Sequence, residues 1–142
     1  MKRLRIIIIL LTILLVFFLI YLGISIHISS MVNEMMQENY NSYGKTLSEK
    51  YSDFISIDDY TKISYRSDDS NIANEINKTE FPCTIWWWNK ATVYYNYSYV
   101  AYDETGDLIC ADGGSMSTPI TLEFSLIYEK GNWRVTNVYV PL

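Results

Sequence analysis

Two stretches of the chain alternate between apolar and polar positions. In residues 90–103, "KATVYYNYSYVAYD", the odd positions are apolar or aromatic up to residue 101 and most even positions are polar. In residues 120–129, "ITLEFSLIYE", the even positions are apolar. A period of two over about ten residues is typical of an antiparallel strand with one buried face. The residues predicted to line that face are Ala91, Val93, Tyr95, Tyr97, Tyr99, Ala101, Ile120, Leu122, Phe124, Leu126 and Tyr128.

Turn signals separate these strands from their neighbours. Residues 131–132 are Gly-Asn, a tight hairpin signal, and "WRVTNVYV" at 133–140 follows as the last strand. Its apolar phase shifts by one residue between Val135 and Val138, which predicts a β-bulge near 136–137. Further turns are expected at "DETGD", residues 103–107, and at Asn89-Lys90.

The region before Pro82 has helical spacing instead. Apolar residues at 47, 51, 54 and 55 predict a short amphipathic helix, and "SIDD" at 56–59 resembles a helix start with serine as N-cap. Apolar residues at 72, 73 and 76 suggest one more short helix that ends before Pro82. Short helices followed by about four strands of a curved antiparallel sheet make an α+β domain.

Residues 6–28, "IIIILLTILLVFFLIYLGISIHI", form an almost unbroken apolar run. As a helix, about 23 residues extend roughly 34 Å, which is enough to cross a hydrocarbon core of about 30 Å. A cleaved signal peptide is the alternative, but its apolar region would be about 7–15 residues long and a small-residue cleavage site would follow. The run is longer and no such site follows it, so the sequence favours a retained anchor.

Basic residues set the expected orientation. Lys2, Arg3 and Arg5 precede the run, and the next basic residue is Lys45. Because basic flanks stay on the cytoplasmic side, we expect a cell-membrane protein with its N-terminus inside and its bulk outside. The expected divisions are a cytoplasmic segment at 1–5, a transmembrane helix at 6–28, a helical stalk or linker at 29–45 and an extracytoplasmic domain at 46–142.

The portion after the anchor is acidic. All 16 Asp and Glu residues lie at Glu34 or later, against the eight basic residues that remain once Lys2, Arg3 and Arg5 are set aside, which leaves a net charge of −8. A negative surface argues against nucleic acid as a partner, and it also keeps a domain soluble.

The two cysteines, Cys83 and Cys110, both fall in the portion expected outside the cell. An oxidising compartment permits a disulfide between them, worth roughly 3 kcal/mol, and two reduced cysteines are the alternative. Two thiols and one histidine, His27, cannot fill a tetrahedral metal site, so neither a metal nor a cofactor is predicted.

Three consecutive tryptophans precede the tyrosine-rich strand. On a strand, Trp86 and Trp88 would point to one side and Trp87 to the other, so the N-terminal helices should cover at least one side. Lining of a core is the favoured interpretation of this aromatic stretch. A surface that stacks a ligand or glycan on Trp86, Trp87, Trp88 and Tyr94 is one alternative, and a partner-docking face is another.

Catalytic groups are not evident. A nucleophile needs a base, and the single histidine lies at the expected membrane edge. The paired carboxylates at 58–59 and 68–69 match helix caps and solvated turns better than a calcium loop. No catalytic residue is predicted, and a pocket carboxylate with a raised pKa is the remaining route to an enzyme.

The order of elements, with "YDETG" ending a long strand and "ITLEFSLIYEKGNWRVTNVYVP" forming the last hairpin, resembles the nuclear-transport-factor-two-like (ketosteroid-isomerase-like) superfamily. The resemblance covers roughly residues 47–142 and is strongest over 90–140. It implies a curved sheet folded around helices, often with a pocket and often dimeric. The domain is short for this family. Its catalytic members use a pocket Asp or His, and no such residue can be placed here, since Glu123 and Glu129 fall on the polar face.

We therefore expect a membrane-anchored, non-enzymatic domain that binds a protein partner or a second copy of itself. The bias towards Ile, Asn, Tyr and Lys suggests a bacterial gene, and hence an assembly of a bacterial envelope. The alternative is a binding domain for a small apolar ligand or glycan, held in an aromatic-lined pocket.

Overall fold

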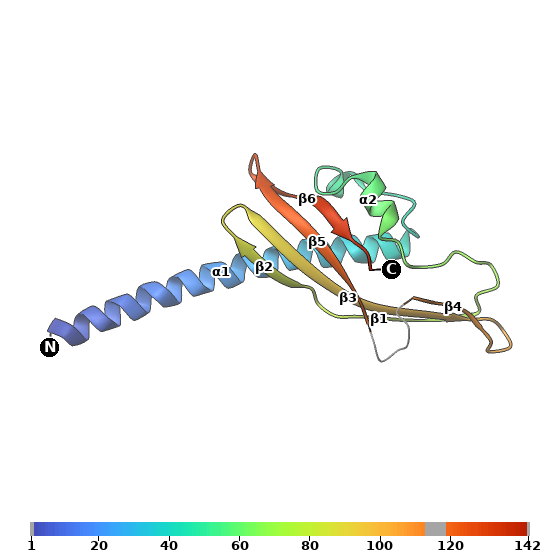
Figure 1. Ribbon diagram of the computed structural model, residues 1–142, viewed down its shortest axis with the longest axis horizontal. Coiled ribbons are helices and arrows are strands. Elements are labelled where there is room, and N and C mark those ends of the chain that lie inside the picture. Colours follow the sequence, from blue (N-terminus) through green and yellow to red (C-terminus); the bar gives the residue numbers. More distant parts are fainter. Residues whose placement is uncertain (1, 113–118, 142) are drawn as a thin grey trace.

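The computed structural model of the protein describes residues 2–112 and 119–141. A single long helix, α1 (Lys2–Asn41), extends from the N-terminus, and a six-stranded antiparallel sheet lies against its second half (Figure 1). The predicted α+β architecture is confirmed. The number of strands is not, because the sheet formed by the described residues has six strands and not about four.

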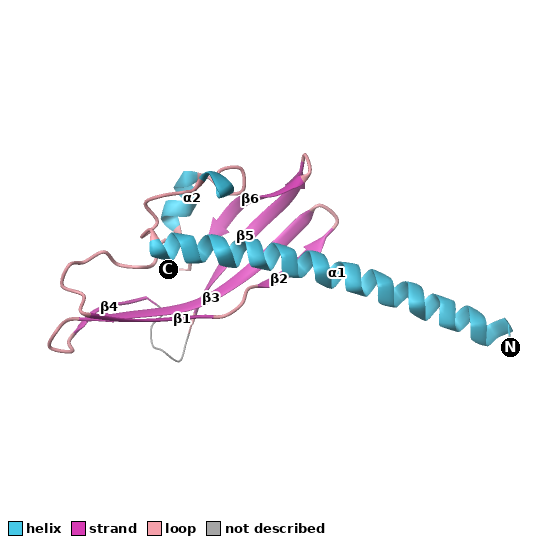
Figure 2. Cartoon of the chain, turned by 180° about the vertical axis from the view of Figure 1, so that it is seen from behind, coloured by secondary structure: helices cyan, strands magenta, loops and turns pink. Residues whose placement is uncertain are grey.

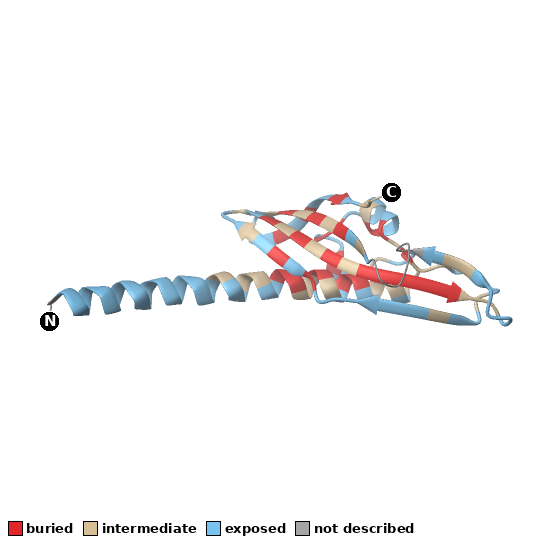
Figure 3. Cartoon of the chain, turned by 60° about the horizontal axis from the view of Figure 1, so that its bottom comes forward, coloured by how far each residue is buried: buried red, intermediate tan, exposed pale blue. Residues whose placement is uncertain are grey.

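The two halves of α1 have different surroundings. Residues 4–20 project away from the rest of the protein with their apolar side chains exposed, and the helix is long and apolar enough to cross a membrane, with a mean hydropathy of 3.2 in its most apolar window. By contrast, the second half crosses one face of the sheet (Figure 2), and much of it is buried there (Figure 3). Its completely buried side chains are Ile28, Val32, Met35 and Met36.

This burial changes the role expected for residues 29–45. The helix does continue beyond the apolar run, as predicted, but it is the central helix of the domain and not a stalk outside it. The methionines and Val32 recur at helical spacing because they face the sheet. The folded unit therefore begins within the apolar run, near Ile24, and not at residue 46.

The chain reverses after α1 through Gly44, which has a left-handed φ of +67°. A side chain at this position would collide with Ser64. The amphipathic helix expected over 47–55 is reduced to a 3₁₀ turn, η1 (Glu49–Tyr51), and to bends. Tyr51, Phe54 and Ile55 are nevertheless buried, as the spacing required.

The helix start predicted at 56–59 is confirmed. Helix α2 (Ile57–Lys62) begins after Ser56, whose hydroxyl accepts a hydrogen bond from the Asp59 amide at 3.1 Å. The segment from η1 to α2 lies along the outer edge of the last strand, where the amide of Val135 donates to the carbonyl of Phe54 at 2.7 Å. This segment protects the edge from pairing with another chain.

The long central strand organises the sheet. The strands are β1 (Asn74–Thr79), β2 (Cys83–Trp87), β3 (Lys90–Tyr102), β4 (Leu108–Asp112), β5 (Ile120–Glu129) and β6 (Asn132–Tyr139). The central strand, β3, pairs with β1 and β2 along one edge and with β4 and β5 along the other. The last strand, β6, pairs with β5. The short helix expected over 72–76 is wrong, because a strand begins at Asn74 and pairs with residues 97–102.

The turns between strands and the bulge in β6 lie close to the positions predicted from the sequence. The β5–β6 turn is formed by Lys130 and Gly131, both with positive φ. Ser125 pairs with Asn137 and Leu126 with Val135, so one extra residue, Thr136, forms the predicted bulge. The turn at 103–107 is confirmed, and the β2–β3 turn lies at 88–89, one residue before its expected position.

The alternating pattern correctly identifies the buried face. All six odd positions from Ala91 to Ala101 are buried, together with Leu122, Phe124 and Leu126. Tyr65 stacks on Tyr97 with ring centroids 3.9 Å apart, so the tyrosines of β3 belong to the core. Two departures occur. Tyr128 is 46% exposed at the end of β5, and Ser98 and Val100, on the opposite face of β3, are buried as well.

Candidate functional site

The three tryptophans lie at the β2–β3 turn, beside the apolar half of α1. Trp86 is held against the helix: its ring stacks on Tyr21 with centroids 5.0 Å apart, and its indole N–H donates to the Tyr21 carbonyl at 3.1 Å. The Trp86 amide also donates to the Tyr21 hydroxyl at 3.4 Å. The helix thus covers the side of β2 that carries Trp86, as expected for one side of the aromatic stretch.

The other two tryptophans are almost fully exposed. Trp87 is 83% exposed on the outer face of the sheet, and Trp88 is 85% exposed. Trp88 was expected to share the side of Trp86, but β2 ends at Trp87 and Trp88 adopts a left-handed φ of 58° in the turn. The favoured interpretation of these tryptophans as core-lining residues is therefore wrong for Trp87 and Trp88.

Two open cavities adjoin this turn. One, of about 550 Å³, lies between α1 and the β5–β6 hairpin and is bounded by His27, Trp88 and Trp133 among others. The second, of about 590 Å³, is bounded by Phe17, Tyr21 and all three tryptophans of the turn. We call the β2–β3 and β5–β6 turns with these cavities the aromatic end of the domain.

Several residues of the aromatic end were not predicted. Phe17, Tyr21 and His27 belong to the apolar run, and only the packing of the sheet on α1 brings them to the tryptophans. Tyr128 and Trp133 come from the β5–β6 hairpin, with ring centroids 5.3 Å apart. No local sequence signal indicates the contacts between α1 and the tryptophans of the turn, because the contact of Tyr21 with Trp86 joins residues 65 positions apart.

Tyr94, the fourth residue predicted to stack a ligand, lies elsewhere. It is on β3, opposite Cys83 on one side and Glu123 on the other, and borders neither cavity. The structure thus brings three of the four predicted stacking residues together.

Of the two alternatives left open by the sequence, the structure has the reduced one, since both Cys83 and Cys110 are free thiols. Cys83 pairs with Tyr94 and Cys110 with Ala101, seven residues apart on the same strand. At about 3.3 Å per residue this places the two cysteines roughly 20 Å apart along β3. Disulfide-bonded Cα atoms lie within about 7 Å, so these two cysteines cannot form a bridge in this fold.

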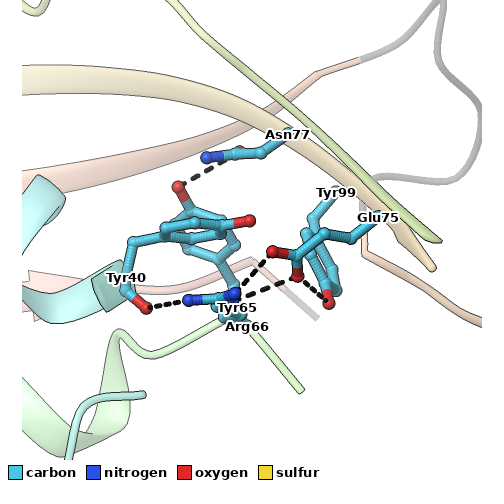
Figure 4. Close-up of polar contacts among 6 residues, drawn as sticks. All are labelled: Tyr40, Tyr65, Arg66, Glu75, Asn77 and Tyr99. Atoms are coloured by element: carbon cyan, nitrogen blue, oxygen red, sulfur yellow. Dashed lines mark hydrogen bonds and ion pairs between the residues drawn. The ribbon is translucent and has the colours of Figure 1, made fainter. Parts of the chain in front are cut away.

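A second cluster joins the end of α1 to β1 and β3 (Figure 4). Arg66 holds Glu75 with two hydrogen bonds, at 2.5 and 3.1 Å, and its guanidinium lies 4.5 Å from the ring centroid of Tyr40. The Tyr99 hydroxyl donates to Glu75 at 3.0 Å. Tyr65 completes the group by donating to Asn77 at 3.3 Å.

The electrostatics of this cluster favour a charged carboxylate. Burial alone would raise the pKa of Glu75, but the hydrogen bonds from Arg66, Tyr40 and Tyr99 outweigh it and hold the pKa below its ordinary value. Burial and the neighbouring Glu75 raise the pKa of Tyr40 to about 12. Glu75 is thus an ionised, paired acid on the inner face of the sheet, where the sequence predicted none.

Among the residues that the structure describes, no three His, Cys, Asp or Glu side chains gather closely enough to hold a metal ion. Comparisons of the chain with family models, curated proteins and solved structures find no match.

Proposed function

We propose that the chain is a single-pass membrane protein with its N-terminus in the cytoplasm and its α+β domain outside, a non-enzymatic interaction or assembly module of a bacterial envelope. The observation that supports it most is the dual role of α1. The same uninterrupted helix carries the exposed apolar residues 4–20 and the buried residues of the domain core. The domain is therefore held at a fixed height above the membrane, with no flexible linker between them.

The outer face of the sheet supports an interaction role. Ile85 and Tyr139 are 57% and 60% exposed on this face, and polar side chains such as Thr92, Ser125 and Asn137 lie between them. Glu123, opposite Tyr139, adds one charge to this face. A mixture of exposed apolar and polar groups is typical of surfaces that bind other proteins. A second copy of the chain is one such partner.

The cluster around Glu75 supports a non-enzymatic role. A general base works best when its pKa lies near the operating pH, which for a carboxylate requires an upward shift. The pKa of Glu75 is shifted down by the bidentate contact to Arg66. This acid faces the interior of the fold, but its partners suit a structural ion pair.

Membership of the nuclear-transport-factor-two-like superfamily is part of the proposal. It is supported by a long central strand, an antiparallel sheet folded over a helix, and a final hairpin that carries a bulge. No residue of this chain takes a catalytic role from that resemblance.

The topology can be tested with the native cysteines. Cys83 is exposed on the domain, so a membrane-impermeant maleimide added to intact cells should label it. A Cys83→Ser variant identifies the adduct, and lysed cells give the total signal. Labelling that appears only after lysis would contradict the proposed orientation.

The interaction role can be tested by photo-cross-linking in intact cells. A photoreactive amino acid at Ile85, on the outer face, should give a discrete adduct with a protein partner or with a second copy of the chain. The same amino acid at Asp53, an exposed residue outside that face, is the control. If Ile85 and Tyr139 both give no adduct and the protein is monomeric in the membrane, the interaction role is wrong.

One observation favours a second candidate function, binding of a small apolar ligand or glycan. The cavity of about 550 Å³ has the size of a small-molecule site and is bounded by Trp86, Trp88 and Trp133. Titration of the full chain with a muropeptide and with palmitate should then shift its tryptophan emission, and Trp133→Ala should weaken the response. An emission spectrum that neither compound alters would exclude these two ligand classes.

A further inference from the structure

The free part of α1 is too short to cross a membrane by itself. Residues 4–20 extend roughly 26 Å at about 1.5 Å per residue, whereas a hydrocarbon core of about 30 Å needs about 20 residues. The next residue, Tyr21, already contacts the sheet through Trp86. A span that begins at residue 4 to 6 therefore ends at about residue 24 to 26, beyond the first contact with the domain.

The side of α1 that faces away from the sheet supports this longer span. Leu22 and Ile26, one helical turn apart, are 38% and 57% exposed there. Apolar residues thus continue for more than one helical turn past Tyr21 on the open side of the helix. The contact of Trp86 with Tyr21 therefore lies about 5–8 Å on the membrane side of the level at which the span ends.

One of the two cavities of the aromatic end includes a residue of the free apolar segment. Phe17 bounds the cavity of about 590 Å³ together with Trp87 and Trp88. In a membrane, Phe17 contacts acyl chains, so the cavity that it shares with the tryptophans opens directly onto lipid. The aromatic end is continuous with the surface of the transmembrane segment.

The exposed tryptophans lie where membrane proteins are enriched in tryptophan, at the level where the span meets the headgroups. Trp and Tyr concentrate at membrane–water interfaces, where the ring contacts the acyl boundary and the polar edge contacts headgroups and water. In water, by contrast, two indoles exposed by more than 80% are costly for a soluble domain. The membrane interface supplies the surface that Trp87 and Trp88 lack within the protein.

Charge along the domain agrees with this orientation. The two turns of the aromatic end carry Lys90 and Lys130, both exposed. The opposite end of the sheet, the β3–β4 turn at 103–107, carries three acidic residues and lies farthest from the N-terminus (Figure 1). Lysines are attracted to an anionic lipid surface, whereas acids are repelled from it.

We infer that the aromatic end is a membrane-interface anchor: Trp87 and Trp88 insert into the headgroup–acyl boundary of the leaflet that α1 leaves, and Lys90 and Lys130 contact lipid phosphates. This inference rests on the membrane anchorage proposed above. The domain is then fixed to the membrane at the helix and at both turns, which sets its tilt as well as its height.

The experiment uses the full chain reconstituted into phosphatidylcholine–phosphatidylglycerol vesicles, with and without lipid brominated in the upper part of the acyl chain. Bromine quenches tryptophans that reach its depth, and all four tryptophans of the chain lie in the domain. We expect clear quenching of the wild type. The Trp87→Phe/Trp88→Phe variant should lose most of it, because these two exposed rings are the ones that lie at interface depth. The control is Trp133→Phe, a buried ring on β6 whose removal should leave the quenching in place.

Flotation of the same vesicles separates the two proposals. If the protein floats with the vesicles but the wild type is not quenched, or the double variant is quenched as strongly as the wild type, the interface anchor is wrong and the membrane anchorage stands. If the protein does not float, both are wrong. Because Trp87 and Trp88 are exposed, the double variant leaves the core intact, and an unchanged melting temperature checks this.

Discussion

Removal of α1 should prevent the domain from folding, even though every strand would remain. A fragment of residues 45–142 contains the whole region once expected to fold by itself. It lacks four completely buried side chains, those of Ile28, Val32, Met35 and Met36. Burial of each is worth about 1.5–3 kcal/mol, so their loss costs about 6–12 kcal/mol. The total stability of a domain this size is about 5–15 kcal/mol, and the fragment is left with little or none.

Two buried polar contacts are lost with the same segment. The side-chain amide of Asn39 donates to the carbonyl of Tyr60 at 2.6 Å, and the hydroxyls of Ser29 and Thr84 lie 2.6 Å apart. Removal of α1 therefore also loses the net contribution of these two hydrogen bonds, about 0.5–1.5 kcal/mol each.

The assay compares this fragment with a second one, residues 21–142, which keeps the buried half of α1 and removes most of the membrane segment. The longer fragment should show dispersed amide resonances and a cooperative thermal transition, and the shorter one neither. A cooperative transition in the fragment 45–142 would refute the assignment of α1 to the core. In the full chain, Met36→Ala should cost about 2–5 kcal/mol, whereas the exposed Gln37→Ala should change stability by less than about 0.5 kcal/mol.

Three further predictions concern the sheet, the ion pair and the turn after α1. Phe124→Ala should lower the free energy of unfolding by about 3–5 kcal/mol, whereas Ser125→Ala, on the outer face of the same strand, should lower it by less than about 0.5 kcal/mol. Equal decreases in melting temperature would show that the outer face is also covered. Glu75→Gln should cost about 1–3 kcal/mol at neutral pH, because the half-buried guanidinium of Arg66 loses its carboxylate. Since the pKa of Glu75 is lowered from 4.5, the ion pair stabilises the fold fully above that pH and stops doing so as the pH falls through the lowered pKa. The unfolding free energies of wild type and variant, measured by denaturant titration, should therefore converge in acid. A difference between them that does not change with pH would contradict this. Gly44→Ala should lower the melting temperature, because the left-handed backbone and the contact with Ser64 both oppose a side chain, and an unchanged melt would contradict the geometry of this turn.

The sequence predicts secondary structure best for elements that bury only one face. The alternation over 90–101 and 120–127 follows the inner face of β3 and β5, and the phase shift near 136 marks the bulge in β6. By contrast, the spacing of apolar residues at 72, 73 and 76 predicts a helix where β1 begins. The inner side of β1 is occupied by the polar residues Glu75 and Asn77, and its one apolar residue, Ile76, points outwards, so no period of two is visible.

The aromatic end could be predicted only in part. Local spacing identified Trp86, Trp87 and Trp88 as a group, but it could not show that the strand ends at Trp87 and leaves Trp88 exposed. Contacts with Tyr21 depend on the docking of the sheet onto α1, a long-range event that no local pattern encodes. For the same reason the apolar run alone could not show where the membrane segment stops and the core begins.

Hydrogen–deuterium exchange of the full chain in lipid nanodiscs tests the central claim most directly. If one continuous helix is both the membrane segment and the core of the domain, the amides of residues 6–20 are protected by lipid and those of 24–36 by the sheet, with no rapidly exchanging gap between them. A run of amides within 21–31 that exchanges as fast as unstructured chain would mean a flexible stalk, and the fixed mounting of the domain on the membrane would be wrong.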